Sequence, residues 1–134
     1  MEMNKEQLIL NKVEEKRQDI IDFVQKMVQI PSVTNNEAAI GDAFYQDMKE
    51  KMHLDDVQMI EAEPGHPNII ARVKGQGDGP TLTFNGHMDV IFEGPAEDWT
   101  YPPYSGEIVD GKLYGRGSVD MKSGTCSSVL AAWI

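Results

Sequence analysis

Two polar segments that follow apolar stretches constrain this chain more than any other feature of its sequence. Residues 85–90 read Asn-Gly-His-Met-Asp-Val, and residues 115–123 read Gly-Arg-Gly-Ser-Val-Asp-Met-Lys-Ser. His87 and Asp89 stand two apart at the end of an apolar strand pattern, so we expect both side chains on one face. Asp120 opens a helical segment, where unpaired backbone N–H groups favour a carboxylate. A fold that joins the two segments would assemble half of a metal site from one imidazole and two carboxylates.

The composition argues against several kinds of partner and compartment. The 134 residues carry a formal net charge of -10, whereas nucleic acids and anionic membranes attract basic surfaces. No apolar run is long enough to span a membrane, and the N-terminal residues lack the apolar core of a secretory signal. The single cysteine, Cys126, excludes an internal disulfide and is expected to be a buried apolar residue. We therefore expect a cytoplasmic protein that binds neither nucleic acid nor membrane.

Hydrophobic spacing predicts three helices. Residues 4–30 repeat apolar side chains at helical intervals until Pro31, and the run Thr-Asn-Asn-Glu at 34–37 matches the capping box of a second helix. The apolar face of the first helix is predicted to consist of Leu10, Val13, Ile20, Val24, Met27 and Val28. The second helix has an apolar stripe that recurs every four residues: Ile40, Phe44, Met48 and Met52. A third helix is expected from Asp120 to the end of the chain.

Strand patterns lie between the second and third helices. Residues 57–60, 69–73 and 82–84 are predicted strands, and the last of them delivers His87 at its C-terminal end. Asp-Gly at 110–111 stands between two short apolar runs and predicts a β-hairpin. The elements together indicate an α/β chain.

The metal-site hypothesis competes with ordinary structural roles for the same residues. His87 alone is more typical of a strand end than of a ligand, but a metal-bound imidazole commonly donates its other N–H to a carboxylate such as Asp89. Asp120 has the alternative role of satisfying backbone N–H groups at a helix start. His53 and His66 are both expected to be exposed to solvent. Signatures of phosphate loops, of H-E-x-x-H metalloproteases and of serine nucleophiles are absent.

The two polar segments closely resemble the N-terminal signatures of the co-catalytic zinc amidohydrolases and peptidases. The matching residues are Phe-Asn-Gly-His-Met-Asp-Val at 84–90 and Gly-Arg-Gly-Ser-Val-Asp-Met-Lys-Ser-Gly at 115–124. Lesser similarities occur in the expected order at 30–32, 99–103 and 110–114. The family includes aminoacylase, acetylornithine deacetylase, succinyl-diaminopimelate desuccinylase, glutamate carboxypeptidase and several di- and tripeptidases.

The resemblance implies a fold, a cofactor and a role for each residue of the site. The fold would be the N-terminal portion of a zinc-exopeptidase-like catalytic domain, with helices packed on a central, mostly parallel mixed sheet. His87 would be a ligand of one of two zinc ions, Asp120 would bridge both ions, and Asp89 would act in catalysis by clamping the imidazole. Cobalt or manganese can occupy such nitrogen and oxygen sites. The peptide bond after Asp120 is often cis in the family.

Several functional residues of the family have no counterpart in residues 1–134. Full-length members also supply an adjacent glutamate pair, with the general base and a ligand, followed by further ligands and a lid domain. No Glu-Glu pair follows Asp120, and the apolar run at 129–134 has no helix-ending signal. We therefore expect residues 1–134 to be an incomplete catalytic domain, cut in the helix after Asp120, without the lid and inactive alone.

Three interpretations remain open from the sequence. The chain is part of a hydrolase that cleaves an amide bond in a small N-acyl amino acid or short peptide, or it is a non-catalytic module that retains the fold. The third interpretation is an interaction piece that pairs its sheet edge with another chain or another copy, as in a homo-oligomer. The substrate and the metal are not determined by these residues.

Overall fold

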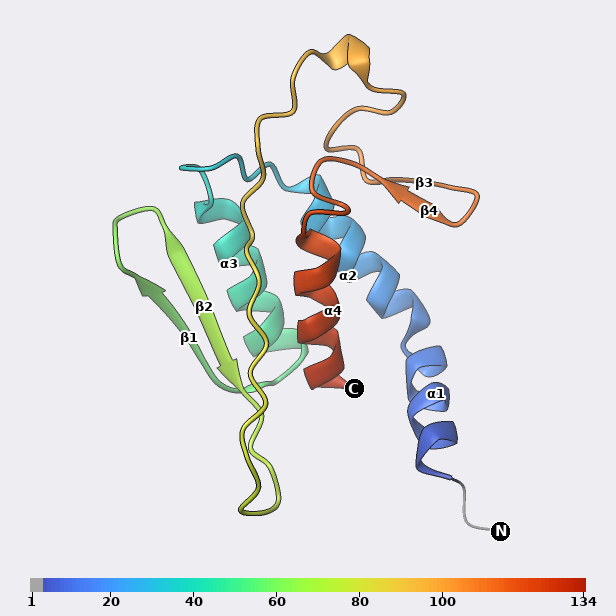
Figure 1. Ribbon diagram of the computed structural model, residues 1–134, viewed down its shortest axis with the longest axis vertical. Coiled ribbons are helices and arrows are strands. Elements are labelled where there is room, and N and C mark those ends of the chain that lie inside the picture. The colour runs from blue at the N-terminus through green and yellow to red at the C-terminus, as the bar shows by residue number, and fades with distance from the viewer. Residues whose placement is uncertain (1–3) are drawn as a thin grey trace.

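The computed structural model describes residues 4–134, in which four α-helices, two short helical turns and two β-hairpins are formed (Figure 1). The helices are α1 (Lys5–Glu15), α2 (Arg17–Gln29), α3 (Ala38–Gln46) and α4 (Lys122–Trp133), with a π-helical turn η1 (Asp47–Lys51) and a 3-10 turn η2 (Ala96–Asp98). The strands are β1 (Asp55–Glu61), β2 (Pro67–Arg72), β3 (Glu107–Val109) and β4 (Lys112–Tyr114). Among these described helices, none has both the length and the apolar character that crossing a bilayer requires.

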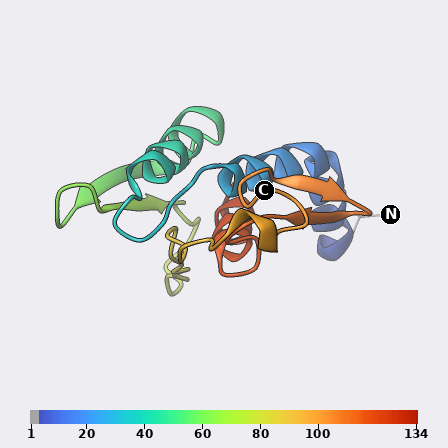
Figure 2. The same ribbon diagram turned by 90° about the horizontal axis from the view of Figure 1, so that it is seen from above.

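Helices α2, α3 and α4 share one hydrophobic core. The rings of Phe23 and Phe44 meet edge to face with centroids 5.7 Å apart, a favourable aromatic arrangement. The buried cluster consists of Phe23, Met27, Ile40, Phe44, Met48, Met52, Cys126 and Leu130. The predicted stripe of the second helix and the predicted burial of Cys126 are therefore confirmed. Viewed from above, α2 and α3 lie on one side of the molecule, and α4 lies on the other side (Figure 2).

The β1–β2 hairpin packs against α3 through a close backbone approach. A Cβ atom on Gly41 would overlap the ring of Pro67, so the absence of a side chain at this helical position lets the strand lie against the helix. The predicted strands at 57–60 and 69–73 are thereby confirmed in all but their bounds. The β3–β4 hairpin is also confirmed, with positive φ angles at Asp110 and Gly111 as a type I′ turn requires.

The first predicted helix is interrupted. At Lys16 the backbone angles are φ -96° and ψ 5°, which separate α1 from α2. No residue of α1 is buried, and Leu10 and Val13 are 61% and 40% exposed. The predicted apolar face is therefore wrong for α1, because this helix extends away from the core in the described part of the chain (Figure 1).

The capping box predicted at 34–37 is also wrong, although the helix that follows it is confirmed. Helix α3 begins at Ala38, and its N-cap residue Glu37 makes no side-chain cap bond. Glu37 instead accepts a hydrogen bond from the backbone N–H of Asn35 at 2.7 Å. The hydroxyl of Thr34 donates to Asp89, a residue far away in the sequence.

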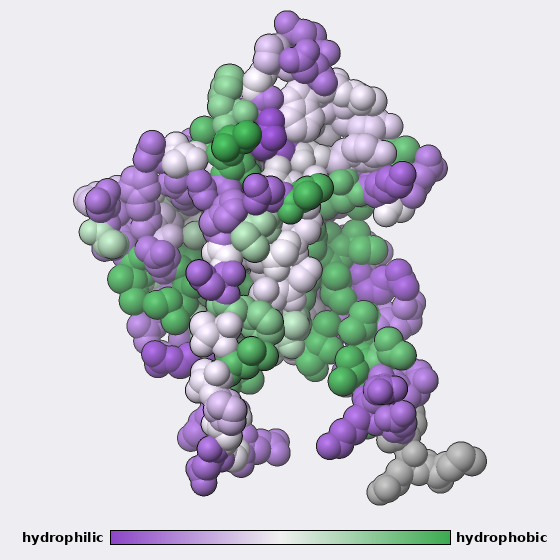
Figure 3. Space-filling model, in the orientation of Figure 1, coloured by the Kyte–Doolittle hydropathy of each residue, from purple (hydrophilic) through white to green (hydrophobic). Residues whose placement is uncertain are grey.

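The expectation of a central, mostly parallel sheet is corrected by the structure. Within residues 4–134, both hairpins are antiparallel and unconnected, and parallel pairing is confined to the bridge between Val33 and Val90. The predicted strand at 82–84 is unpaired, with Leu82 and Phe84 77% and 54% exposed. Figure 3 shows apolar side chains on the face that carries this segment.

A groove of about 1470 Å³ lies beside the predicted strand. Residues of β2, of the extended segment at 81–86 and of α4 line the groove. The ribbon view shows this segment running between β2 and α4 (Figure 1). A strand requires a second row of backbone donors and acceptors at its side, and no other described part of the chain enters the groove. The alternating pattern at 82–84 therefore predicts the extended backbone correctly, but the predicted strand is not part of a sheet.

Replacing a core residue and a residue of the extended segment tests this arrangement. We expect Phe44→Ala to lower the free energy of unfolding by about 3–5 kcal/mol, because it leaves a cavity between α2 and α3. Leu82→Ala, the matched control on an exposed side chain, should change it by no more than about 0.5 kcal/mol. Urea denaturation followed by circular dichroism measures both, and equal losses would contradict the exposed placement of the segment.

Candidate metal centre

The chain segment that follows α2 holds the loop at 87–90. The hydroxyl of Ser32 donates to the backbone oxygen of Met88 at 2.8 Å, and the N–H of Val90 donates to the backbone oxygen of Ser32 at 2.8 Å. The N–H of Thr34 donates in turn to the backbone oxygen of Val90 at 3.1 Å. Ser32 is fully buried, so this short parallel pairing is shielded from water. The loop is thereby fixed to the C-terminal end of α2.

Lys122 attaches the second polar segment to the same end of α2. Its fully buried ammonium group donates to the backbone oxygens of Met27 at 3.0 Å and Ile30 at 2.6 Å. The last carbonyl groups of a helix have no partners within the helix and carry partial negative charge, so they suit a cation. Burial lowers the pKa of Lys122 from 10.5 to about 8. This contact places Asp120, two residues earlier, beside the loop at 87–90.

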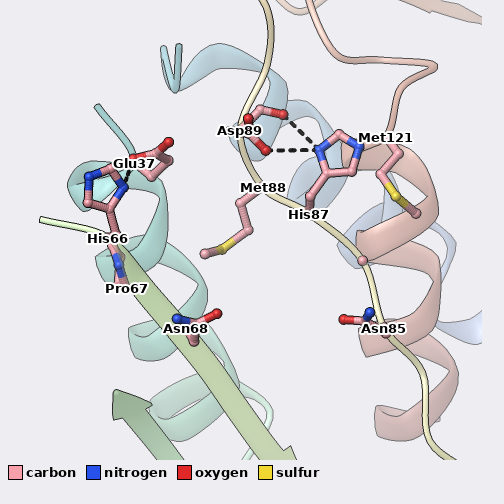
Figure 4. Close-up of a pocket in the computed structure, with 10 residues that line it drawn as sticks. Glu37, His66, Pro67, Asn68, Asn85, His87, Met88, Asp89 and Met121 are labelled. Carbon is pink, nitrogen blue, oxygen red and sulfur yellow. Dashed lines mark hydrogen bonds and ion pairs between the residues drawn. The ribbon is translucent and has the colours of Figure 1, made fainter. Parts of the chain in front are cut away.

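The three residues predicted from the sequence meet at this point. His87 Nε2 lies 3.1 Å from Asp120 Oδ1, and these residues are 33 positions apart in the chain. On the other side of the ring, Nδ1 lies 3.1 Å from Asp89 Oδ1 and 3.0 Å from the backbone oxygen of Asp89 (Figure 4). The peptide bond between Asp120 and Met121 is cis, as the resemblance implied.

The two carboxylates alter the acidity of the imidazole. Partial burial disfavours the charged ring and alone would lower the pKa of His87. Hydrogen bonds to the Asp89 backbone and to the Asp120 carboxylate, together with both negative charges, outweigh this effect and raise the pKa above 6.5. The two carboxylates therefore stabilise the charged form of the ring.

A pocket of about 480 Å³ lies beside His87 and has a second carboxylate–imidazole pair on its opposite wall. His66 Nδ1 lies 3.1 Å from Glu37 Oε2, and the Glu37 side chain is nearly buried (Figure 4). The sequence patterns do not predict this pair, because they place His66 in an exposed turn and Glu37 in a capping box. No local signal joins the two residues, since only the packing of β2 on α3 brings them together. His53, the remaining histidine, is exposed as predicted.

The donor set fits part of a zinc site. An imidazole whose Nδ1 faces a carboxylate has its Nε2 free to bind a metal, and the carboxylate of Asp120 supplies an oxygen at the same place. Structural zinc sites usually need four ligands, and catalytic sites need three and a water. Within residues 4–134 no group of three or more His, Cys, Asp or Glu side chains is arranged to hold a metal ion. The described residues therefore bring together one imidazole nitrogen and one carboxylate oxygen, which is fewer donors than a zinc site needs.

Comparison with known proteins relates this segment to one family. Residues 83–133 match the model described as Peptidase family M20/M25/M40. The chain is 40% identical over 112 residues to a succinyl-diaminopimelate desuccinylase of Methylorubrum extorquens and 39% identical over 114 residues to one of Cereibacter sphaeroides. A third relative of the same name, from a Bradyrhizobium species, is 36% identical over 118 residues. The alignments cover 81–85% of this chain but only 28–30% of the relatives.

The effect of Asp120 on the His87 ring is measurable by NMR. We expect the pKa of His87 to lie above 6.5 and to fall when Asp120→Asn removes the charge at Nε2. Because the pKa in the folded state is raised, these contacts stabilise the fold fully below pH 6.5, and the contribution is lost as pH rises through the folded-state pKa. A pKa of His87 that is the same in both proteins would contradict the contact with Asp120.

Proposed function

Because the chain belongs to Peptidase family M20/M25/M40, we propose that residues 1–134 are part of the catalytic domain of a metal-dependent hydrolase. The hydrolase cleaves the amide bond of a small N-acyl amino acid or a short peptide. The name of the relatives, succinyl-diaminopimelate desuccinylase, favours the N-acyl amino acid as substrate. The observation that carries the proposal is the approach of His87 and Asp120 to 3.1 Å, with Asp89 behind the ring.

In this proposal His87 and Asp120 would hold zinc in the whole protein, where the carboxylate of Asp120 would serve both ions of a zinc pair. Cobalt or manganese would fit the same nitrogen and oxygen donors. When bound, the metal pair lowers the pKa of a shared water and polarises the scissile carbonyl group. The N–H at Nδ1 of His87 would donate a hydrogen bond to Asp89, and this bond would keep Nε2 directed at the metal. Lys122 and Ser32 hold the segments at 115–123 and 85–90 in fixed positions relative to each other.

The described residues do not supply every group that amide hydrolysis requires. A general base must take a proton from the water and return it to the leaving amine. In this proposal the three acidic and imidazole groups of the centre hold or orient the metal, and Glu37 is paired with His66, so we expect the base to come from another part of the whole protein. We therefore expect the 134-residue chain alone to be inactive. We expect the whole protein to be cytoplasmic and to act on small molecules, and the acidic charge of these 134 residues disfavours nucleic acids as partners.

Metal titration of the purified chain tests the proposal. We expect calorimetry with zinc chloride to detect one weak site, and His87→Ala to weaken it by about tenfold or more. The matched control, His53→Ala, removes an exposed imidazole outside the centre and should leave the affinity unchanged. Equal affinity in the His87→Ala protein and the original chain would contradict the assignment of His87.

Activity assays on the purified 134-residue chain test whether it lacks a group that catalysis requires. We expect no hydrolysis of N-succinyl amino acids, N-acetyl amino acids or dipeptides with zinc, cobalt or manganese present. Hydrolysis that disappears in His87→Ala would show that the chain contains its own general base and would overturn the inactivity. Hydrolysis that persists in this variant would instead identify a contaminating enzyme.

A second candidate function is that of an interaction module. The observation in its favour is the unpaired extended segment at 81–86 beside a groove, with Leu82 and Phe84 exposed. Unpaired extended backbone with apolar side chains promotes pairing with another chain. Light scattering at increasing concentration distinguishes the two roles, because a monomer at all concentrations would count against self-association.

A further inference from the structure

The hydroxyl of Thr34 makes a hydrogen bond that neither the family match nor the metal-site proposal uses. Thr34 Oγ1 donates to Asp89 Oδ2 at 2.8 Å, while the other carboxylate oxygen of Asp89 lies 3.1 Å from His87 Nδ1. The backbone N–H of Thr34 is itself bonded to the oxygen of Val90, one residue beyond Asp89. Thr34 therefore contacts this loop through both its backbone and its side chain.

We propose that Thr34 is a positioning residue whose hydroxyl holds the Asp89 carboxylate in the orientation that presents its other oxygen to the His87 ring. The role is exerted on Asp89, and Thr34 itself makes no contact with His87 or Asp120 that would let it bind a metal. The consequence for metal affinity rests on the proposed function, whereas the effect on the His87 ring does not.

A free aspartate at this position would not hold one orientation. The torsion about the last bond of an aspartate side chain has a broad energy minimum, and the Asp89 side chain is 33% exposed, so water competes for its oxygens. A hydrogen bond to an ionised acceptor is stronger than a neutral one. The 3.5 Å contact from the same hydroxyl to the backbone oxygen of Val90 is longer and to a neutral group. The carboxylate of Asp89 is therefore the preferred acceptor.

The backbone and side chain of Thr34 are suited to this task. A β-branched side chain has few favourable rotamers, so a fixed backbone also fixes the direction of the hydroxyl. The hydroxyl is not needed as a helix cap, since α3 begins only at Ala38 and Glu37 provides its N-cap position. Asn35, with φ of 74°, turns the chain between Thr34 and the helix. The hydroxyl is thereby directed at Asp89 instead of at the first turn of α3.

The position of the proton on the neutral His87 ring tests the proposal in the metal-free chain. The carboxylate and the backbone oxygen of Asp89 both favour the proton on Nδ1, whereas the carboxylate of Asp120 favours it on Nε2. Nitrogen-15 NMR at alkaline pH reports the ratio of the two forms. We expect Thr34→Val, which replaces the hydroxyl by a methyl group of similar size, to lower the Nδ1–H to Nε2–H ratio by about two- to tenfold, as for one lost hydrogen bond.

Two further variants separate positioning from a structural effect. Thr34→Ser retains the hydroxyl and should return the ratio to that of the original chain, and Thr100→Val applies the same chemical change to an exposed threonine outside the centre. Thr34→Ala serves in place of the valine variant if that protein does not fold. An unchanged ratio without the hydroxyl, or the same ratio in the serine and valine variants, would overturn the proposal.

Zinc affinity in a double-mutant cycle then tests whether Thr34 acts through Asp89. We expect Thr34→Val to raise the zinc Kd by about tenfold, at the lower end of the range for groups that orient a ligand. In the Asp89→Ala background, the same change should have no further effect. An equal loss in both backgrounds would overturn action through Asp89. If the original chain binds no zinc, the proposed function fails, and the NMR ratio still decides the role of Thr34.

Discussion

The ammonium group of Lys122 on the carbonyl end of α2 is the contact on which the rest of the structure depends. It is buried and has backbone oxygens as hydrogen-bond partners, with the ring of Tyr104 5.9 Å away. Burying a charge is unfavourable unless its hydrogen bonds are well made, so the arrangement of α2 and α4 must preserve this geometry. The segment at 32–34, which holds the loop of His87, leaves the same helix end. Both halves of the candidate centre are therefore attached to the C-terminal end of α2.

The parts of the fold that follow from local chemistry were predictable from the sequence. The four-residue spacing of the stripe on α3 and η1 requires one buried helical face, and Asp110-Gly111 requires a tight hairpin. The meeting of His87 with Asp120 follows from the resemblance, and the two side chains lie 3.1 Å apart. The sheet was not predictable in the same way, because pairing depends on a neighbouring strand, and an alternating pattern at 82–84 carries no information about whether one is present.

The error at Thr34 and Glu37 has a different physical origin. A threonine three residues before a glutamate satisfies the local pattern of a capping box, yet both side chains find partners that are distant in sequence. The hydroxyl of Thr34 donates to the charged carboxylate of Asp89, and Glu37 pairs with His66 on the pocket wall opposite His87. Local patterns fail where tertiary contacts offer better partners, and here these contacts lie around the candidate centre.

The bridge between Val33 and Val90 has a consequence for the extended segment that precedes it. Side chains alternate in direction along an extended chain, so Leu82 and Phe84 share the parity of Val90, which is 3% exposed. A shift of the segment by one residue would reverse every side chain and would require the bridge to break. The bridge therefore fixes the segment at the Val90 end, whereas Leu82 and Phe84 at the other end are exposed and have no strand beside them in the described part of the chain.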